Sequence, residues 1–244
     1  MLDILYRDDH LIAIDKPPGL LVHRSDLDRH ETRFAVQLLR DQIGRRVQPV
    51  HRLDRGTSGV LLFAFDAGVT RELSRQFEAN EVEKTYLAVV RGWPPEEGLI
   101  DHALSRRFDD YGRSLPDAPP QPAQTRFRRL ATIELPVAID RYPTARYALV
   151  ELQPLTGRQH QLRRHLKHIA HPIIGDATHG KGRHNRHFRQ EFGCGRLLLA
   201  CTHLAFRHPV TDEKVGVGAM PGDQFAALLE RFGWSQFNTP RPAA

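Results

Sequence analysis

The order in which strand and helix patterns follow one another limits most strongly what this chain can fold into. Eight segments have the alternating or short apolar pattern of β-strands, and four have the periodicity of amphipathic helices. The two kinds do not alternate regularly, as they do where helices connect parallel strands. We therefore predict an α+β fold with a mostly antiparallel sheet. The predicted strands are residues 4–6, 10–15, 59–65, 85–90, 125–135, 146–152, 204–207 and 214–217, and the predicted helices are residues 33–43, 69–79, 159–169 and 224–232.

Several residues mark where these elements begin and end. The stretch from Lys16 to Gly19 contains two prolines and is predicted to be a turn, because proline has no backbone N–H for a strand ladder. Asp66 and Thr156 are typical N-cap residues and are expected to begin the helices that follow them. Residues 106–122 are rich in proline and charge and poor in apolar side chains, so we expect an inserted surface loop without a helix.

The chain has 244 residues, enough for one large domain with an extensive core. No break in composition marks a boundary, so we expect a single domain over residues 1–236 and a flexible tail over 237–244. No apolar run approaches the roughly 18 residues that a membrane helix needs, and the N-terminus lacks the apolar stretch of a secretion signal. With only Cys194 and Cys201, no disulfide framework is expected, so a reducing cytoplasm is the predicted location.

Basic residues are concentrated in one part of the chain. Residues 155–190 contain eight Lys or Arg and one acid, Asp176, which gives this segment a net charge of +7, while the whole chain carries +6. The other residues therefore sum to −1. A nearly neutral body with one strongly basic segment is typical of a protein that binds a polyanion such as a nucleic acid. The alternative is a solvated charged face with no partner.

The loop from His51 to Gly59 holds the first candidate for chemistry. Its one carboxylate, Asp54, lies between Arg52 and Arg55 and shortly before an apolar strand. Loops held by a rigid core are where proteins place catalytic groups, and a fixed, poorly hydrated carboxylate is a nucleophile or a base. The alternative is a structural aspartate that caps a turn, with both arginines facing solvent.

The second candidate is Arg163, in the predicted helix over residues 159–169. The spacing of this helix places polar side chains, including Arg164 and Lys167, on one face and apolar ones such as Leu162 on the other. Arg163 points between the two faces, where a guanidinium can pair with a carboxylate through two hydrogen bonds. The alternative is an exposed helix charge that contributes little.

Tyr86 is the third candidate. In the predicted strand over residues 85–90 it shares a face with Ala88 and Val90, and a tyrosine with small neighbours can be a stacking platform for a base. The alternative is an ordinary core tyrosine.

Histidines recur in the basic segment, at His165, His168 and His171. No His-Glu-x-x-His or Cys-x-x-Cys pattern accompanies them, so a zinc site has little support. The sequence also lacks the glycine-rich patterns that bind nucleotide phosphates. We therefore expect neither a metal nor a nucleotide cofactor.

Five motifs, found in order between residue 15 and about residue 208, resemble those of the RluA-type pseudouridine synthases. The motifs are Lys16-Pro17-x-Gly19-Leu20, His51-Arg52-Leu53-Asp54-x-x-Thr57-Ser58-Gly59, Lys84-x-Tyr86-x-Ala88-x-Val90-x-Gly92, Thr156-Gly157-Arg158-x-His160-Gln161-Leu162-Arg163-x-His165-Leu166 and His171-Pro172-Ile173-Ile174-Gly175-Asp176-x-x-His179-Gly180. Their number and order make the resemblance specific. One departure is Asp15, where the family usually has Asn.

The resemblance implies one catalytic domain with a central mixed, mainly antiparallel sheet, flanking helices and a cleft for RNA. It implies an enzyme that isomerises uridine to pseudouridine without a cofactor. By position in the motifs, Asp54 is expected to be the catalytic aspartate and Arg163 its ion-pair partner. Tyr86 is expected to stack on the uracil and could accept a proton, and Leu162 to line the uracil pocket. The full set of residues expected to contact the RNA is Arg52, Thr57, Arg158, His160, Leu162, Arg164 and Lys167.

Three further stretches, residues 121–123, 141–147 and 182–186, resemble most closely a branch of the family that modifies uridine 65 of tRNA. The S4-like RNA-binding domain that many rRNA-modifying members carry before the first motif is not expected here. The predicted partner is therefore tRNA, bound by a monomer with no membrane partner. An rRNA target is the alternative within the family. In other classes, the alternatives are a non-catalytic RNA-binding protein and a metal-dependent nuclease that uses the histidines.

Overall fold

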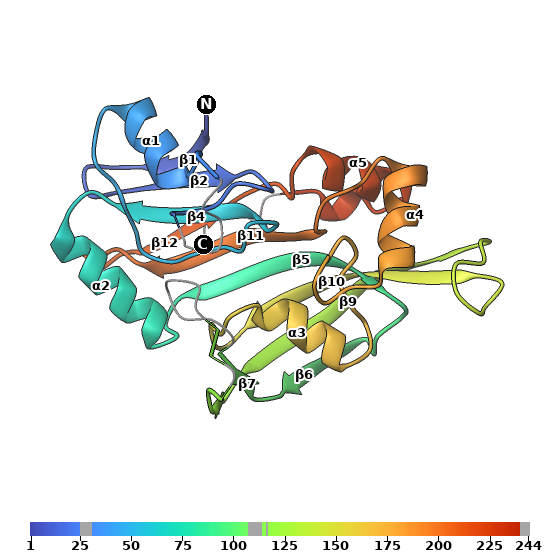
Figure 1. The fold of residues 1–244 in the computed structure, drawn as a ribbon. Coiled ribbons are helices and arrows are strands. Elements are labelled where there is room, and N and C mark those ends of the chain that lie inside the picture. The colour runs from blue at the N-terminus through green and yellow to red at the C-terminus, as the bar shows by residue number, and fades with distance from the viewer. Residues whose placement is uncertain (25–30, 107–113, 116, 240–244) are drawn as a thin grey trace.

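The structure, a computed structural model, describes residues 1–24, 31–106, 114–115 and 117–239. In this part of the chain, ten strands form one sheet and five α-helices flank it (Figure 1). The strands of the sheet are β1 (Asp3–Arg7), β2 (Leu11–Lys16), β3 (Gln48–Pro49), β4 (Ser58–Ala64), β5 (Glu83–Arg91), β6 (Glu97–Asp101), β9 (Gln124–Leu135), β10 (Ala145–Pro154), β11 (Leu199–Arg207) and β12 (Lys214–Gly218). A separate pair consists of β7 (Leu104–Ser105) and β8 (Pro120–Gln121). The helices are α1 (Ala35–Ile43), α2 (Ala67–Glu78), α3 (Gln161–His168), α4 (Gly182–Phe192) and α5 (Asp223–Arg231), and Ser235–Phe237 form a 3₁₀ turn.

The sheet is mixed but mainly antiparallel, which confirms the predicted fold class. Its order is β1-β2-β4-β11-β5-β10-β9-β6, with β3 paired to β4 and β12 paired to β11. Among the described strands, β4 and β11 form the one parallel pair, where Ser58 lies opposite Ala200 and Gly59 opposite Cys201. Gly59 has a φ of 105°, and a Cβ there would lie 2.0 Å from the Cys201 carbonyl oxygen. The close approach of these two strands therefore requires glycine.

Side chains of β5 and β10 alternate between two cores on opposite faces of the sheet. On one face, Val89 packs in a cluster with Phe188 of α4 and Phe225 of α5. On the other face, Ala88 packs in a cluster with Leu162 of α3. Figure 1 shows α3 in front of β9 and β10. The alternation therefore places α3, which carries the second candidate motif, on the face of the sheet to which Tyr86 also belongs.

A third core joins the first strands to the first two helices. Leu39 of α1 and Leu73 of α2 are fully buried in a cluster with the residues of β2 and β4. All seven residues of β4 are buried, which confirms the predicted apolar strand in this region. Asp66 is the N-cap of α2, as expected, and its carboxylate accepts a hydrogen bond from the Val69 N–H at 2.9 Å.

Several details of local structure differ from the predictions. Thr156 is not the N-cap of α3; that position is held by His160 in the left-handed conformation, while the Thr156 hydroxyl donates to the Gln161 side chain. Helix α4 and strands β3, β6 and β7 were not predicted. Within the predicted loop 106–122, Pro120 and Gln121 form β8, and residues 107–113 and 116 lie outside the described residues, as do residues 240–244 of the predicted tail.

None of the helices in the described part of the chain is long and apolar enough to cross a membrane.

Candidate active site

Asp54 lies in the loop that leads into β4, and its backbone is fixed from two sides. Its carbonyl accepts a hydrogen bond from the Thr57 N–H at 3.0 Å, which closes a tight turn. His51, three residues earlier, accepts the Leu62 N–H and stacks on Phe77 of α2 at 4.5 Å between ring centroids. Burial and the charge of Lys84 lower the pKa of His51 to about 3, so this histidine is neutral. The loop is therefore anchored to the sheet by an uncharged side chain.

Lys16 connects the first motif to the same loop. Its side chain is fully buried at the end of β2, and its ammonium donates to the carbonyls of Pro17 and Leu20 and, at 3.3 Å, of Arg55. Burial, followed by the charge of Arg196, lowers the pKa of Lys16 to about 7. The lysine thus joins the predicted proline turn to the residue directly after Asp54.

Arg163 and Asp54 form an ion pair across 109 residues of sequence. The Arg163 Nη1 lies 3.0 Å from Asp54 Oδ2, and the side chains are 11% and 24% exposed. The opposite edge of the same guanidinium binds Asp176, with Nε at 2.7 Å and Nη2 at 2.8 Å. Although burial disfavours its charge, hydrogen bonds to Asp176 and the charge of Asp54 raise the pKa of Arg163. The guanidinium is therefore a fixed positive charge between two carboxylates.

His160 faces the other oxygen of Asp54. Its Nε2 lies 3.9 Å from Asp54 Oδ1, and its Nδ1 lies 3.3 Å from His179 Nε2. Its φ of 53° is left-handed, which turns the chain sharply into α3. Burial lowers the pKa of His160, so the ring is neutral at neutral pH and can present either a donor or an acceptor.

Tyr86 projects from β5 on the α3 face, opposite Cys201 of β11. Burial raises the pKa of Tyr86 well above 10, and its interaction with Cys201 and the charge of Asp54 raise it further. The hydroxyl is therefore protonated at neutral pH in the resting protein. The Tyr86 ring packs against the same apolar cluster as Leu162, and its stacking on uracil stays a prediction.

The other residues predicted to contact RNA differ in their burial and in their partners. Leu162 and Thr57 are buried, Arg52 is exposed, and Lys167 is exposed on α3. Arg158 and Arg164 are both attached to neighbouring loops: Arg158 donates to the Pro122 carbonyl and Arg164 to the Ser105 carbonyl. Arg55, which sequence places beside Asp54, instead forms an ion pair with Glu31.

Asp176 is the site residue that sequence reasoning missed. Its carboxylate is fully buried against Arg163, and it accepts the N–H groups of Thr178 and His179 at 2.9 Å each. These interactions lower the pKa of Asp176 although burial opposes this. A signal was present in the sequence, because Asp176 is the one acid among eight bases in residues 155–190. A single acid in such a segment is expected to have a specific basic partner.

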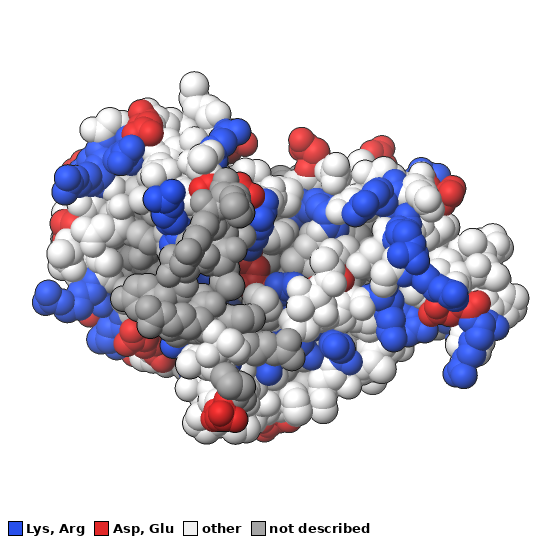
Figure 2. Space-filling view, in the orientation of Figure 1, with Lys and Arg blue, Asp and Glu red and all other residues white. Residues whose placement is uncertain are grey.

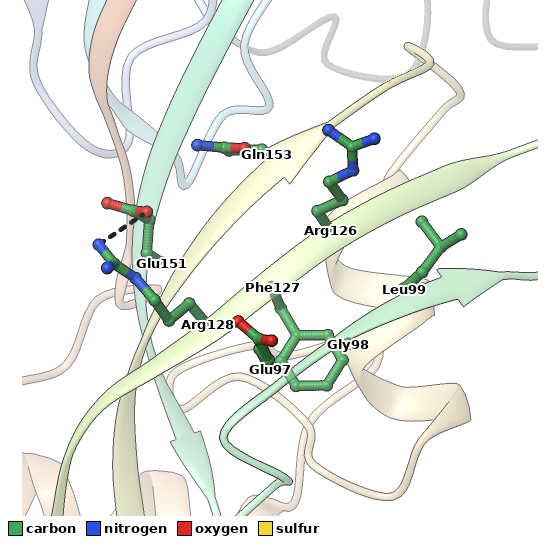
Figure 3. Close-up of a pocket in the computed structure, with 8 residues that line it drawn as sticks. All are labelled: Glu97, Gly98, Leu99, Arg126, Phe127, Arg128, Glu151 and Gln153. Atoms are coloured by element: carbon green, nitrogen blue, oxygen red, sulfur yellow. Dashed lines mark hydrogen bonds and ion pairs between the residues drawn. The ribbon is translucent and has the colours of Figure 1, made fainter.

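A hollow of about 540 Å³ lies elsewhere on the molecule, over β6, β9 and β10 (Figure 3). Its side chains include Arg126 and Arg128 of β9 and Glu151 of β10, and Arg128 and Glu151 form an ion pair at 3.4 Å. Leu152, next to Glu151, is the residue that pairs with Tyr86. Because side chains alternate along a strand, Glu151 points to the opposite face of the sheet from Tyr86. This hollow is therefore separate from the candidate active site.

Exposed basic residues gather on α4, whose Asn185 side chain contacts the loop of Asp176. Helix α4 presents Arg183, Arg186 and Arg189, with Lys181 just before it, and Figure 2 shows a band of Lys and Arg side chains over this helix. Among the residues that the structure describes, no group of three or more His, Cys, Asp or Glu side chains could hold a metal ion. Helix α4 therefore carries exposed positive charge of the kind that attracts a phosphate backbone.

Comparison with known proteins defines the class to which this fold and site belong. The pattern of the RNA pseudouridylate synthase family matches residues 10–168, which include Asp54, Tyr86 and Arg163. The chain therefore belongs to this family, which confirms the resemblance seen in the motifs and the predicted class of enzyme.

Individual relatives match nearly the whole chain. The tRNA pseudouridine synthase C of Yersinia pestis is 52% identical over 96% of this chain and 92% of its own length. The protein of the same name from Vibrio cholerae is 48% identical over 97% of this chain and 98% of its own. Among solved structures, the human RNA Pseudouridylate Synthase Domain Containing 1 protein has a TM-score of 0.70 at 26% identity, and the alignment covers 99% of this chain and 97% of that one.

Proposed function

We propose that the protein isomerises uridine 65 of tRNA to pseudouridine, with Asp54 as the catalytic carboxylate. The observation that carries this proposal is the ion pair between Asp54 and Arg163, which leaves Asp54 Oδ1 free of the guanidinium. The relatives named tRNA pseudouridine synthase C, about half identical along nearly the whole chain, support tRNA as the substrate. The three stretches noted in the sequence support the position within tRNA.

The reaction moves one bond of the nucleotide. The bond from N1 of uracil to C1′ of the ribose breaks, the uracil turns, and a bond from C5 to C1′ forms; C5 then loses its proton and N1 gains one. Asp54 Oδ1 either attacks C1′ as the bond to N1 breaks and leaves again when C5 attacks, or it removes the proton from C2′ and returns it once C5 has bonded to C1′. The product has the same atoms as the substrate, so the net reaction consumes no oxidant, reductant or ATP.

Two side chains next to Asp54 serve the free uracil. Tyr86 stacks on the ring while the glycosidic bond is broken, and its high pKa keeps the hydroxyl neutral during this step. Leu162, buried in the same cluster, forms an apolar wall of the uracil pocket. Together they keep the base close to C1′ long enough for C5 to react.

Binding energy from outside the site makes the target accessible. A base in a stem must be turned out of the stack, which costs a few kcal/mol. Phosphate contacts from Lys167 on α3 and from the arginines of α4 offset that cost (Figure 2). In this proposal, residues 1–236 act as one catalytic domain. The reaction takes place in the cytoplasm, where tRNA is found.

The central experiment is Asp54→Asn. We expect no release of tritium from tRNA labelled at C5 of uridine, with an affinity for tRNA within about twofold of the parent, because the amide keeps the shape of the carboxylate but is a poor nucleophile and base. Full turnover by the variant would refute the role of Asp54. If the protein instead binds RNA without catalysis, the parent chain also shows no turnover.

A second experiment tests the target. Total RNA from a strain that lacks the gene is treated with carbodiimide, and the stops of reverse transcriptase at pseudouridine are mapped. We expect one stop, at position 65 of tRNA, to disappear and to return when the gene is restored. Loss of a stop in rRNA with the tRNA stops unchanged would contradict the proposal and favour the rRNA alternative.

A further inference from the structure

The Arg163 guanidinium is held by Asp176 in a particular orientation. Asp176 takes the two-nitrogen edge formed by Nε and Nη2, at 2.7 and 2.8 Å, and so leaves the Nη1 end for Asp54. A guanidinium that presents one nitrogen can bind one oxygen of a carboxylate, whereas its two-nitrogen edge binds both oxygens. With the Nε–Nη2 edge held by Asp176, Arg163 meets Asp54 through Nη1 at Oδ2, and Oδ1 of Asp54 is not bound by the guanidinium.

Asp176 is itself fixed by its loop. Its side chain is fully buried and accepts two backbone N–H groups, from Thr178 and His179. The Asn185 side chain of α4 binds the backbone on both sides, because it accepts the Gly175 N–H and donates to the Asp176 carbonyl. Gly175 has a φ of 80°, and a Cβ there would lie 1.8 Å from the Arg196 carbonyl oxygen. The loop has little freedom to move.

The same loop reaches the other oxygen of Asp54. His179 is buried, and its Nε2 lies 3.3 Å from Nδ1 of His160, whose Nε2 faces Asp54 Oδ1 at 3.9 Å. Arg163 and His160, which approach one oxygen of Asp54 each, are therefore both held from behind by residues of one turn.

We propose that Asp176 is a positioning residue for the isomerisation, which acts on Asp54 through Arg163 and keeps the reactive oxygen free. This inference rests on the proposed catalytic role of Asp54. Without the Asp176 carboxylate, Arg163 can turn its two-nitrogen edge onto Asp54 and occupy both oxygens, including the one that must approach the ribose. The guanidinium would then still bind the carboxylate but would hold it in an unreactive arrangement.

The test is Asp176→Asn, measured by tritium release in single turnover with enzyme in excess, and by tRNA binding on filters. We expect the rate to fall by about 100-fold, the size of effect produced by displacing a catalytic group by about 1 Å. The dissociation constant should stay within about twofold, because Asp176 is buried and does not reach the RNA surface. An unchanged rate, or a loss confined to binding, would overturn the proposal.

A double-mutant cycle with Arg163→Lys separates positioning from general damage to the fold. If Asp176 acts through Arg163, the double variant reacts no more slowly than Arg163→Lys alone, because lysine has no two-nitrogen edge to orient. If the two losses multiply, Asp176 acts independently of Arg163 and the proposal fails. Should Asp176→Asn not fold, Asn185→Ala loosens the same loop without removing the carboxylate, and the same non-additivity is expected.

Two control variants complete the design. Asp8→Asn removes a carboxylate that also accepts two backbone N–H groups, those of His10 and Leu11. Asp8 precedes the first residue of β2, whereas Lys16, which contacts the Asp54 loop, is the last residue of that strand. Its rate should match the parent, and an equal loss in this variant would overturn the specific role of Asp176. Asp54→Asn shows which of the two proposals is wrong. If Asp54→Asn is active, the proposed function is wrong. If Asp54→Asn is inactive while Asp176→Asn keeps the rate of the parent, only the proposed role of Asp176 is wrong.

Discussion

Asp15 is placed where a carboxylate destabilises the folded protein at neutral pH. It is partly buried in β2, opposite Asp3 of β1. Burial raises the pKa of Asp15 to about 6, the charge of Asp3 raises it further, and the charge of Arg196 opposes the rise only in part. The RluA-type family usually has Asn at this position, which has the same shape and no charge. Asp15→Asn should therefore stabilise the protein.

The size and the pH range of the effect follow from the shift of this pKa from 3.8 to about 6. A folded-state pKa above the unfolded one means that the folded chain binds the proton more tightly. The stabilisation that protonated Asp15 gives the folded state is fully present below about pH 4 and is lost as the pH rises through 6. Two pKa units correspond to about 3 kcal/mol, and screening by the solvent that reaches Asp15 reduces this to about 1 to 2 kcal/mol.

Urea unfolding of the parent and of Asp15→Asn at pH 4, 5, 6, 7 and 8 measures this difference. We expect the two free energies of unfolding to coincide near pH 4 and to separate by about 1 to 2 kcal/mol at pH 7. Asp3→Asn, which removes only the neighbouring repulsion, should give a smaller gain over the same range. A difference that does not change with pH, or a loss of stability at pH 7, would refute the reasoning.

Two further predictions concern the reaction and the RNA surface. Tyr86→Phe should retain the single-turnover rate within about threefold because the ring still stacks, whereas Tyr86→Ala should lose about 10- to 100-fold; equal losses in both would show that the hydroxyl is needed. Arg158→Ala combined with Lys167→Ala should lower the slope of log K against log[salt] in tRNA binding by about 2, and an unchanged slope would place the phosphates elsewhere.

The fold was largely predictable from the sequence, and the elements that were missed have a physical reason. Strand β6 has one buried residue, Ile100, among five, so it lacks the alternation by which strands are recognised. Helix α4 buries only His184 and Phe188 and begins at a glycine. Both are held by the elements they pack on, and such tertiary stabilisation leaves little trace in local sequence.

The site was predictable as a set of residues and one ion pair, but not in the rest of its geometry. The resemblance to the family indicated Asp54, Arg163 and their ion pair, which the structure contains, whereas Arg55, beside Asp54 in sequence, pairs with Glu31. The pairing depends on how the α3 face of the sheet meets the loop before β4, which no local pattern encodes. The role of Asp176 depends on the same packing, since its carboxylate meets Arg163 only once both are buried.

The charges of residues 155–190 divide into two groups with different physical roles. Arg163 faces inward, and Asp54 and Asp176 together more than neutralise it, so the centre itself does not attract phosphate. Attraction must come from the outward group, including Lys167 and the arginines of α4 (Figure 2). Salt screens exposed charges far more than buried pairs. Substrate binding can therefore depend strongly on ionic strength while the arrangement that performs the chemistry stays constant, and this separation lets a carboxylate react within a surface built for a polyanion.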